Sequence, residues 1–201
     1  GGILRAGLGF SQCDIAVLTN INEDHLGLSD INDLKDLTRV KRVVLDSVKK
    51  DGWAVLNADD EYSMKIVDDL HAKVAIFSMD ENNPYIKKFA KEGKITCVYE
   101  EGYITIKKGD WKIRIEKVNL IPITMEGKAK FMIANSLAAA LACYLYGFGI
   151  EDIAMAMRTF IPSAQLTPGR LNIFKFKNFK VMIDFAHNPA GVETVLREFK
   201  K

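Results

Sequence analysis

Residues 14–27 read DIAVLTNINEDHLG, an apolar run that is followed at once by a polar segment. Residues 15–18 have the length and composition of a buried strand, and residues 19–27 bring together two carboxylates, a histidine, two amides and a hydroxyl. In parallel α/β sheets, ligands bind in the crevice outside the carboxyl ends of the strands. The stretch therefore predicts a parallel α/β sheet with a ligand site directly after this strand. On spacing alone, the same residues also fit an Asx-type turn and a helix N-cap, with His25 as an ordinary surface residue.

The chain beyond this stretch alternates between helix and strand patterns. Apolar residues recur at spacings of three and four over residues 30–48, which predicts a helix. Residues 50–52 (Lys-Asp-Gly) have turn composition, and residues 53–56 predict a second buried strand. Residues 61–70 then predict a helix and residues 73–79 a third strand. This β-α-β-α-β order predicts parallel strands with helices packed on the faces of the sheet.

The pattern changes in the middle of the chain. Residues 95–99, 103–107 and 111–116 show near-alternation of apolar and polar side chains and are separated by turn residues, so they predict antiparallel hairpins. An Ala-rich helix is predicted over residues 134–146. At 1.5 Å per residue it would span about 20 Å, less than the ~30 Å of a hydrocarbon core, so we interpret it as a buried helix and not a membrane span.

A domain boundary is predicted over residues 162–169, which hold two prolines, a serine, a glutamine and a glycine. We place a first domain at residues 1–166 and a second at residues 167–201. The second begins with predicted strands at residues 171–176 and 180–185, and a helix follows them. The predicted fold class is α/β: a mostly parallel sheet with flanking helices and an antiparallel insertion, followed by the start of a second, Rossmann-like α/β domain.

The composition is that of an ordinary soluble domain, with 48% hydrophobic and 27% charged residues among 201. The 28 basic and 26 acidic residues are interleaved and give a net charge of +2, so no basic stripe is present and nucleic acid is not an expected partner. Three cysteines without a C-x-x-C pair argue against a disulfide framework or a zinc site and for a reducing compartment. No signal-like segment opens the chain, so we expect a cytoplasmic protein without membrane contact, cut from inside a longer chain.

Several short sequence motifs then resemble those of a known family. The segment TNINEDHLG resembles the strand-end segment of the Mur ligase superfamily, the ATP-dependent amide-forming ligases. Further words follow in one order over nearly the whole chain: GGILRAGLGF (1–10), LNADD (56–60), TPGRLN (167–172) and DFAHNP (184–189). Within the superfamily they are most similar to the cyanophycin synthetase family. Peptidoglycan-precursor and folylpolyglutamate ligases are the alternatives among enzymes, and a non-catalytic interaction module that kept the ligase fold is the alternative from another class.

The resemblance implies a role for particular residues. His25 would help to hold Mg²⁺, as one member of a shell that consists mostly of oxygen atoms and water. Lys41 stands where many Mur ligases carry a carbamylated lysine, although as a residue type it also fits the solvated face of a helix. Asn135, in a segment similar to the N-A-L-A-A of the family, would lie beside the nucleotide base, or would instead cap the predicted helix.

The second predicted domain supplies the remaining candidates. Arg170 would meet phosphate oxygens through its planar guanidinium and, with Lys41, would serve catalysis. Asp184 would accept hydrogen bonds from ribose hydroxyls at the end of a strand. His187 would orient its loop or touch the substrate, and Asn188 would begin the last helix ahead of Pro189. The implied cofactors are ATP and Mg²⁺, the implied substrate is an amino acid or peptide, and the parent protein is expected to form a homo-oligomer.

One element of such an enzyme is missing from the sequence. No G-x-x-x-x-G-K-[ST] phosphate-binding motif occurs in the 201 residues. We therefore expect this motif upstream in the parent protein, and we expect the chain alone to be inactive.

Overall fold

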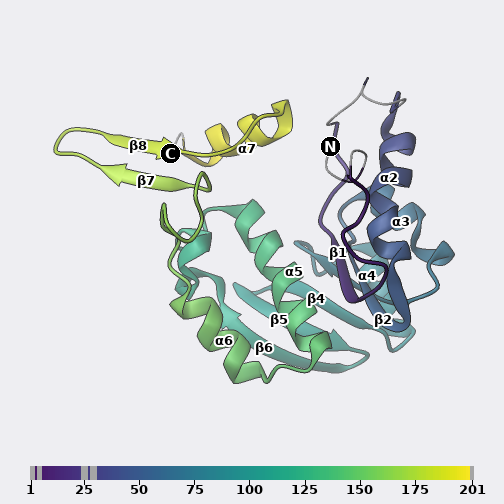
Figure 1. The fold of residues 1–201 in the computed structure, drawn as a ribbon. Helices are drawn as coiled ribbons and strands as arrows, with labels where there is room; N and C mark the ends of the chain where they lie inside the picture. Colours follow the sequence, from purple (N-terminus) through teal and green to yellow (C-terminus); the bar gives the residue numbers. More distant parts are fainter. Residues whose placement is uncertain (1–2, 4–5, 24–26, 28–30, 200–201) are drawn as a thin grey trace.

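A six-stranded sheet forms the centre of the structure (Figure 1). The computed structural model describes residues 3, 6–23, 27 and 31–199. The strands, in spatial order, are β1 (Cys13–Leu18), β2 (Val48–Asn57), β3 (Lys73–Ser78), β4 (Ile95–Glu100), β5 (Tyr103–Lys108) and β6 (Trp111–Lys117). The first four strands are mutually parallel, and β5 and β6 extend the same sheet with antiparallel pairing. The predicted mostly parallel α/β sheet is confirmed, and β4 belongs to both its parallel and its antiparallel part.

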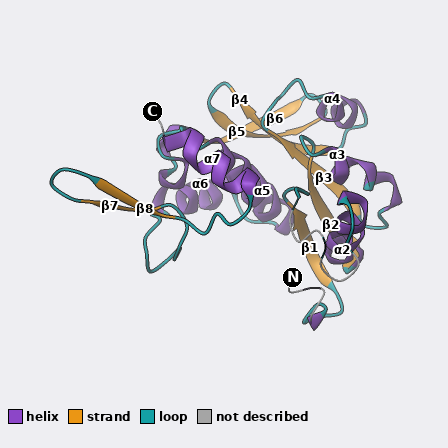
Figure 2. Ribbon diagram, turned by 90° about the horizontal axis from the view of Figure 1, so that it is seen from above, coloured by secondary structure: helices purple, strands orange, loops and turns teal. Residues whose placement is uncertain are grey.

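Helices cover both faces of this sheet (Figure 2). They are α2 (Leu34–Asp46), α3 (Glu61–Lys65), α4 (Pro84–Lys91), α5 (Lys130–Tyr146) and α6 (Ile150–Thr159). Successive side chains of a strand point to opposite faces. Accordingly Ala54 and Leu56 pack in the core under α2, α3 and α4, whereas Val55 packs in the core under α5 and α6. All three side chains are fully buried, so the sheet is a middle layer between two helical layers.

The sequence marks several helix ends with the expected capping residues. Asp33 caps α2 by accepting hydrogen bonds from the backbone N–H groups of Lys35 and Asp36, both at 2.8 Å. Asn83 caps α4, and Pro84 occupies its first turn. Helix α5 ends at Gly147, whose φ of 107° is a left-handed conformation that glycine adopts without strain.

Three boundary predictions are wrong. The helix predicted over residues 61–70 is shorter, because α3 ends at Lys65 and a 3-10 helix follows at Val67–Asp69. Residues 50–52 do not form a turn, because β2 continues through them from Val48 with an irregularity in its register against β1. Gly52 serves close packing there: a Cβ atom at this position would lie 2.4 Å from the carbonyl oxygen of Asp14. Helix α5 begins at Lys130, before the predicted start at residue 134, so Asn135 lies inside the helix and does not cap it. The residue at the N-cap is Ala129, which makes no side-chain capping bond.

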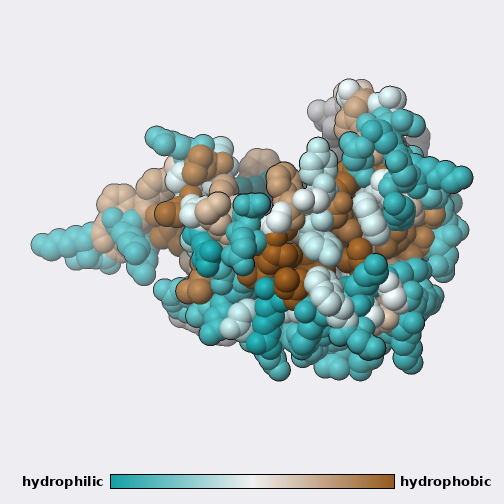
Figure 3. Space-filling view, turned by 90° about the horizontal axis from the view of Figure 1, so that it is seen from below, coloured by the Kyte–Doolittle hydropathy of each residue, from teal (hydrophilic) through white to brown (hydrophobic). Residues whose placement is uncertain are grey.

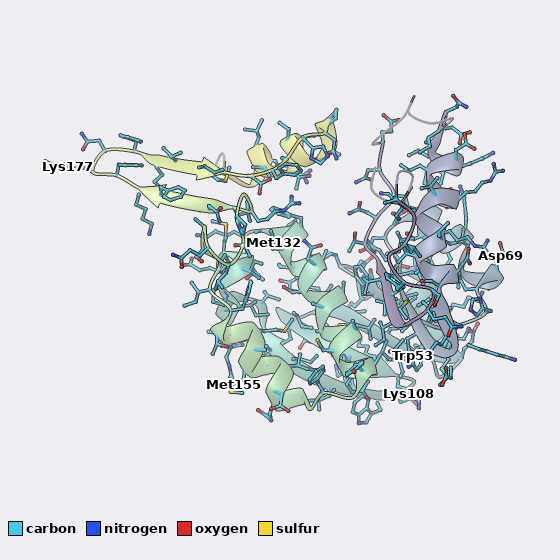
Figure 4. The ribbon with its side chains drawn as sticks, in the orientation of Figure 1. Trp53, Asp69, Lys108, Met132, Met155 and Lys177 are labelled. Atoms are coloured by element: carbon cyan, nitrogen blue, oxygen red, sulfur yellow. The ribbon has the colours of Figure 1, made fainter. Side chains whose placement is uncertain are left out.

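The C-terminal segment is an antiparallel hairpin followed by a helix. Its elements are β7 (Asn172–Lys175), β8 (Lys180–Ile183) and α7 (Pro189–Phe199). Leu171 and Val195 are buried against Ala129 and Met132 at the start of α5, and this small cluster joins the segment to that helix. Figure 4 shows Lys177 at the far tip of the hairpin and Met132 near its base. A boundary at residue 166 and a Rossmann-like second domain stay predictions.

The cysteines and the surface agree with the composition. Cys13, Cys97 and Cys143 are all free; Cys97 is fully buried, and the other two are half-buried against the two cores. Burial raises the pKa of the Cys97 thiol far above its usual range. Seen from below, the surface is hydrophilic around the edge with a hydrophobic area near the middle (Figure 3). Across the part of the chain that the structure describes, no helix combines the length and the apolarity needed to cross a membrane.

Candidate nucleotide and substrate cleft

A polar cleft lies between the carboxyl ends of β1 and β2 and the C-terminal segment. It has two adjoining parts, with volumes of about 960 Å³ and about 610 Å³. The two parts share six of their lining residues, which are Asn20, Asn22, Asn57, His187, Asn188 and Ala190. Residues from the two ends of the chain therefore share one cleft, at the edge of the sheet where the sequence predicted a ligand site.

The smaller part brings together four of the predicted site residues. Asn135, Arg170, Asp184 and His187 all line it, although three different segments carry them. The guanidinium of Arg170 is exposed and lies over the ring of Phe185, with its central carbon 5.3 Å from the ring centroid. This position leaves the charged edge of the guanidinium accessible from the cleft.

Asp184 is half-buried and fixes the backbone around it. One carboxylate oxygen accepts a hydrogen bond from the N–H of Leu171 at 3.0 Å, and the other accepts one from the N–H of Ala186 at 2.8 Å. Leu171 has a positive φ of 49°, so this bond helps to hold a conformation that a leucine rarely adopts. Each carboxylate oxygen can accept a further hydrogen bond. Asp184 thus has a structural role, and lone pairs remain for a ligand.

His187 and Asn188 shape the loop before α7. A ring nitrogen of His187, Nδ1, lies 3.0 Å from the carbonyl oxygen of Phe185, and the two rings are 5.0 Å apart. The side chain of Asn188 accepts a hydrogen bond from the N–H of Gly191 at 2.8 Å, which confirms its predicted place at the start of the last helix. The imidazole therefore stands over the cleft on a loop whose backbone is held at both ends.

Asn135 projects from the second turn of α5. Its amide nitrogen lies 3.8 Å from the sulfur of Met132, and the residue is exposed. The capping interpretation is wrong for the reason given above, and the helix instead carries the amide to the wall of the cleft.

The opposite wall is the loop that follows β1. Within this loop Ile21 is only 3% exposed and packs in the core, whereas Asn20, Asn22 and Glu23 are exposed and line the larger part of the cleft. Lys41, from α2, lies behind the loop, where its ammonium donates a hydrogen bond to the carbonyl of Asn20 at 3.1 Å. Lys41 is thus close to the predicted site without lining the cleft.

The LNADD motif at the end of β2 forms hydrogen bonds with residues at the ends of β1 and β3. The side chain of Asn57 donates to the carbonyl of Thr19 at 2.8 Å and accepts from the N–H of Asp59 at 2.9 Å, so its amide has a structural role. Asp59 accepts hydrogen bonds from the hydroxyl of Ser78 at 2.5 Å and the N–H of Met79 at 2.7 Å. These contacts connect the ends of β1, β2 and β3.

Asp60 is a functional candidate that sequence reasoning missed. It caps α3 and also accepts a hydrogen bond from the N–H of Ile21 in the loop after β1. The sequence did carry a signal for it: Asp60 comes directly after a predicted buried strand and before a predicted helix, in the motif LNADD that the family resemblance had already selected.

The predicted metal ligand His25 lies outside the described residues. Among the residues that the structure does describe, no group of three His, Cys, Asp or Glu side chains is arranged to hold a metal ion. The cleft does offer oxygen atoms from Asn20, Asn22 and Glu23. Mg²⁺ bound to a nucleotide needs only one or two protein carboxylates, because phosphates and water complete its shell. The donor chemistry of the cleft therefore fits Mg²⁺.

Comparison with known proteins gives one family. Residues 5–143 match the family model described as the Mur ligase middle domain. The chain is 49% identical over 191 residues to a cyanophycin synthetase of Geminocystis herdmanii, a match that covers 95% of this chain and 22% of that protein. The chain thus spans about a fifth of the length of this relative.

Two solved structures share the fold. MurF from Acinetobacter baumannii has a TM-score of 0.66 at 16% identity, over 94% of this chain and 38% of that one. The MurF ligase from Thermotoga maritima in complex with ADP has a TM-score of 0.61 at 17% identity, over 94% of this chain and 40% of that one. At these identities the likeness concerns the fold alone.

Proposed function

Because the chain belongs to the Mur ligase middle-domain family, we propose that it is the part of a longer ATP-dependent ligase that holds the nucleotide beside the substrate carboxylate. In this reaction class the carboxylate takes the terminal phosphoryl group of ATP, ADP leaves, and an amine displaces phosphate from the acyl phosphate to form an amide. The cleft carries this proposal, since it brings Asn135, Arg170, Asp184 and His187 to the carboxyl end of a parallel sheet.

We further propose the cyanophycin synthetase type of reaction, in which arginine is joined to the aspartate side chains of a poly-aspartate backbone. The support is the 49% identity to a cyanophycin synthetase over nearly the whole chain. The ADP complex of a protein with the same fold is consistent with ATP as the nucleotide. A peptidoglycan-precursor or folylpolyglutamate ligase would share the cleft and would differ in the amine it accepts.

Each cleft residue has chemistry that fits a part of the nucleotide. The exposed guanidinium of Arg170 suits phosphate oxygens, and the amide of Asn135 suits the donor and acceptor edge of a base. The free lone pairs of Asp184 suit ribose hydroxyls, while His187 stands where substrate or nucleotide would pass. Mg²⁺, when bound, would neutralise phosphate charge beside the oxygen atoms of Asn20, Asn22 and Glu23.

Lys41 and His25 remain in the proposed site. As an ammonium, Lys41 holds the carbonyl of Asn20 and thereby the loop that carries the metal-side oxygens. As a carbamate, it would present a carboxylate-like group from the same position, as the family resemblance implies. His25 follows this loop in the sequence and stays the predicted histidine ligand of Mg²⁺.

The test is a ligation assay on the complete protein that contains these residues, with release of ADP measured in the presence of Mg²⁺, arginine and a poly-aspartate acceptor. Arg170→Ala should lower kcat/KM by roughly 30- to 1000-fold, or about 2–4 kcal/mol, because it removes a charge-assisted contact to the transferring phosphoryl group. Arg39→Ala is the matched control, because its side chain is 80% exposed on α2, where it pairs with Asp36 one turn earlier.

The outcomes separate the candidates. Stimulation by another amino acid and acceptor would identify a different Mur-type ligase. No ATP-dependent release of ADP with any acceptor would identify a non-catalytic module and reject the proposal. The chain of 201 residues alone should release no phosphate above a blank, because it contains no phosphate-binding motif.

A further inference from the structure

Three consecutive residues of the loop after β1 are held by side chains from elsewhere in the chain. Each contact uses a backbone group of the loop, and each partner comes from a different position around it. The contacts join Thr19 O to Asn57 Nδ2 at 2.8 Å, Asn20 O to Lys41 Nζ at 3.1 Å, and Ile21 N to Asp60 Oδ2. Tertiary partners therefore hold the backbone of the loop at residues 19–21.

These contacts decide which way the loop side chains point. Ile21 is directed into the core, where it is 3% exposed, and its neighbours Asn20 and Asn22 are exposed toward the cleft. If the backbone rotated at this point, the polar side chains would leave the cleft and the apolar one would leave the core. Fixing the backbone at residues 19–21 therefore preorganises the polar wall of the site.

Asp60 occupies the decisive position in this arrangement, because its two oxygens serve different elements. Oδ1 accepts hydrogen bonds from the N–H groups of Tyr62 at 2.9 Å and Ser63 at 3.2 Å, which caps α3. Oδ2 accepts the N–H of Ile21. One carboxylate thus couples the start of a helix at the end of β2 to the loop at the end of β1.

We propose that Asp60 is a positioning residue for the ligase reaction: it sets the conformation of residues 19–23 and thereby aligns the polar side chains that meet the magnesium-bound triphosphate. This inference rests on the proposed function of the cleft. Asp60 lines the larger part of the cleft, but it acts through the loop, because both of its oxygens already accept backbone N–H groups.

The substitution Asp60→Asn separates the two roles of the carboxylate. Asparagine is as good an N-cap residue as aspartate, so its Oδ1 can still cap α3. Its Nδ2 is a donor and cannot accept the N–H of Ile21, so the loop contact is lost. In the complete protein we expect the KM for magnesium ATP to rise about tenfold, the Kd for magnesium ADP in calorimetry to rise similarly, and the thermal midpoint to change little.

Asp33→Asn is the matched control. Asp33 caps α2 through bonds to Lys35 and Asp36, so the substitution makes the same change at a helix start and leaves the contacts of residues 19–21 in place. This variant should keep the KM and Kd of the parent. A second variant, Asp60→Ser, keeps an oxygen that can cap α3, but its side chain is too short to reach Ile21. This variant should reproduce the loss of nucleotide affinity.

The inference is overturned if Asp60→Asn keeps the parental KM and Kd, or if it lowers the thermal midpoint without changing either constant. It is also overturned if both Asp60 variants fail to fold, because Asp60 would then hold the structure as a whole. These results leave the proposed function intact when the parent is active. A parent that neither binds nor turns over ATP would overturn the proposed function as well as this inference.

Discussion

Glu100, the last residue of β4, offers the sharpest test of the energetics of the sheet. Its residue surface is only 5% exposed, and its two carboxylate oxygens meet Lys107 Nζ at 2.6 Å and Lys112 Nζ at 3.2 Å. Burial alone would raise the pKa of Glu100, but the hydrogen bonds and charges of the two lysines lower it below its ordinary value of 4.5. The perturbation is Glu100→Gln, which keeps the shape and removes the charge.

The magnitude follows from the two contacts. A hydrogen bond to a charged group contributes about 1.5–3 kcal/mol, against about 0.5–1.5 kcal/mol for a neutral one. The contact to Lys107 is well buried, whereas the side chain of Lys112 is 50% exposed and is screened by water. We therefore expect Glu100→Gln to lower the free energy of unfolding at pH 7 by about 1–3 kcal/mol. For a chain of this length the thermal midpoint should fall by roughly 2–12 °C.

The pH dependence gives the sign of the effect. A carboxylate whose pKa is lowered by folding stabilises the folded state above its unfolded pKa, and this stabilisation is lost as the pH falls through the folded pKa. The difference in unfolding free energy between the parent and Glu100→Gln should therefore be full at neutral pH, begin to shrink near the ordinary value of 4.5, and close below the lowered value.

The assay is urea unfolding of the 201-residue chain at neutral and acidic pH. Glu101→Gln is the control, because Glu101 pairs with Arg114 at the surface, where the two side chains are 66% and 42% exposed. Such a pair contributes no more than about 1 kcal/mol. The reasoning is refuted if the two variants are equally stable, or if the deficit of Glu100→Gln does not change with pH.

Two further variants test the backbone of the sheet and of the cleft. Gly52→Ala should lower the free energy of unfolding by about 1–3 kcal/mol, because the new Cβ would lie 2.4 Å from the carbonyl oxygen of Asp14. Gly9→Ala is the control, because no atom lies within 4 Å of the position of its Cβ. Equal unfolding curves for the two variants would contradict the close-packing argument. Asp184→Asn weakens the carboxylate contacts to Leu171 and Ala186, so amide hydrogen exchange at these two residues should become faster while exchange in β3 stays unchanged. Unchanged exchange at Leu171 would show that Asp184 does not hold the loop.

The parallel strands were predictable because each of the first three contains a continuous apolar run. These runs, at residues 15–18, 53–56 and 74–77, lie within β1, β2 and β3, and their order with the helices implies the parallel arrangement. The error at residues 50–52 has a physical cause. Lys-Asp-Gly has turn composition, but its glycine is required by the close carbonyl of Asp14, a contact that only the strand pairing creates.

The start of α5 was missed for a related reason. Its N-cap is Ala129, which makes no side-chain capping bond, so the sequence carries no local mark of the helix start. The helix begins there because Ala129 and Met132 are buried against Leu171 and Val195, more than thirty residues later in the chain. Tertiary packing sets this boundary, and local capping patterns do not contain it.

The sequence predicted four residues that line the cleft, but it did not predict the residue that holds the loop on the other side of the cleft. Family words selected Asn135, Arg170, Asp184 and His187, and the fold places all four along one cavity wall. Asp60 was not selected, because its role depends on β1 and β2 being neighbours, with Leu18 opposite Leu56. Only that register places the carboxylate of Asp60 beside the backbone of Ile21.

Asp184 and Arg170, which the C-terminal segment contributes to the smaller part of the cleft, are held in different ways. Asp184 is fixed, since both of its oxygens hold backbone N–H groups, and it keeps Leu171 in an uncommon conformation next to Arg170. Arg170 is exposed and is positioned by the ring of Phe185, so its guanidinium can follow a phosphate as charge develops. Under the proposed function, a fixed acceptor beside an exposed donor suits a site in which the sugar stays in place and the phosphoryl group moves. For this reason the loss of Arg170 should lower the rate of ligation more than the loss of charge at Asp184, whose first effect is on the order of the loop.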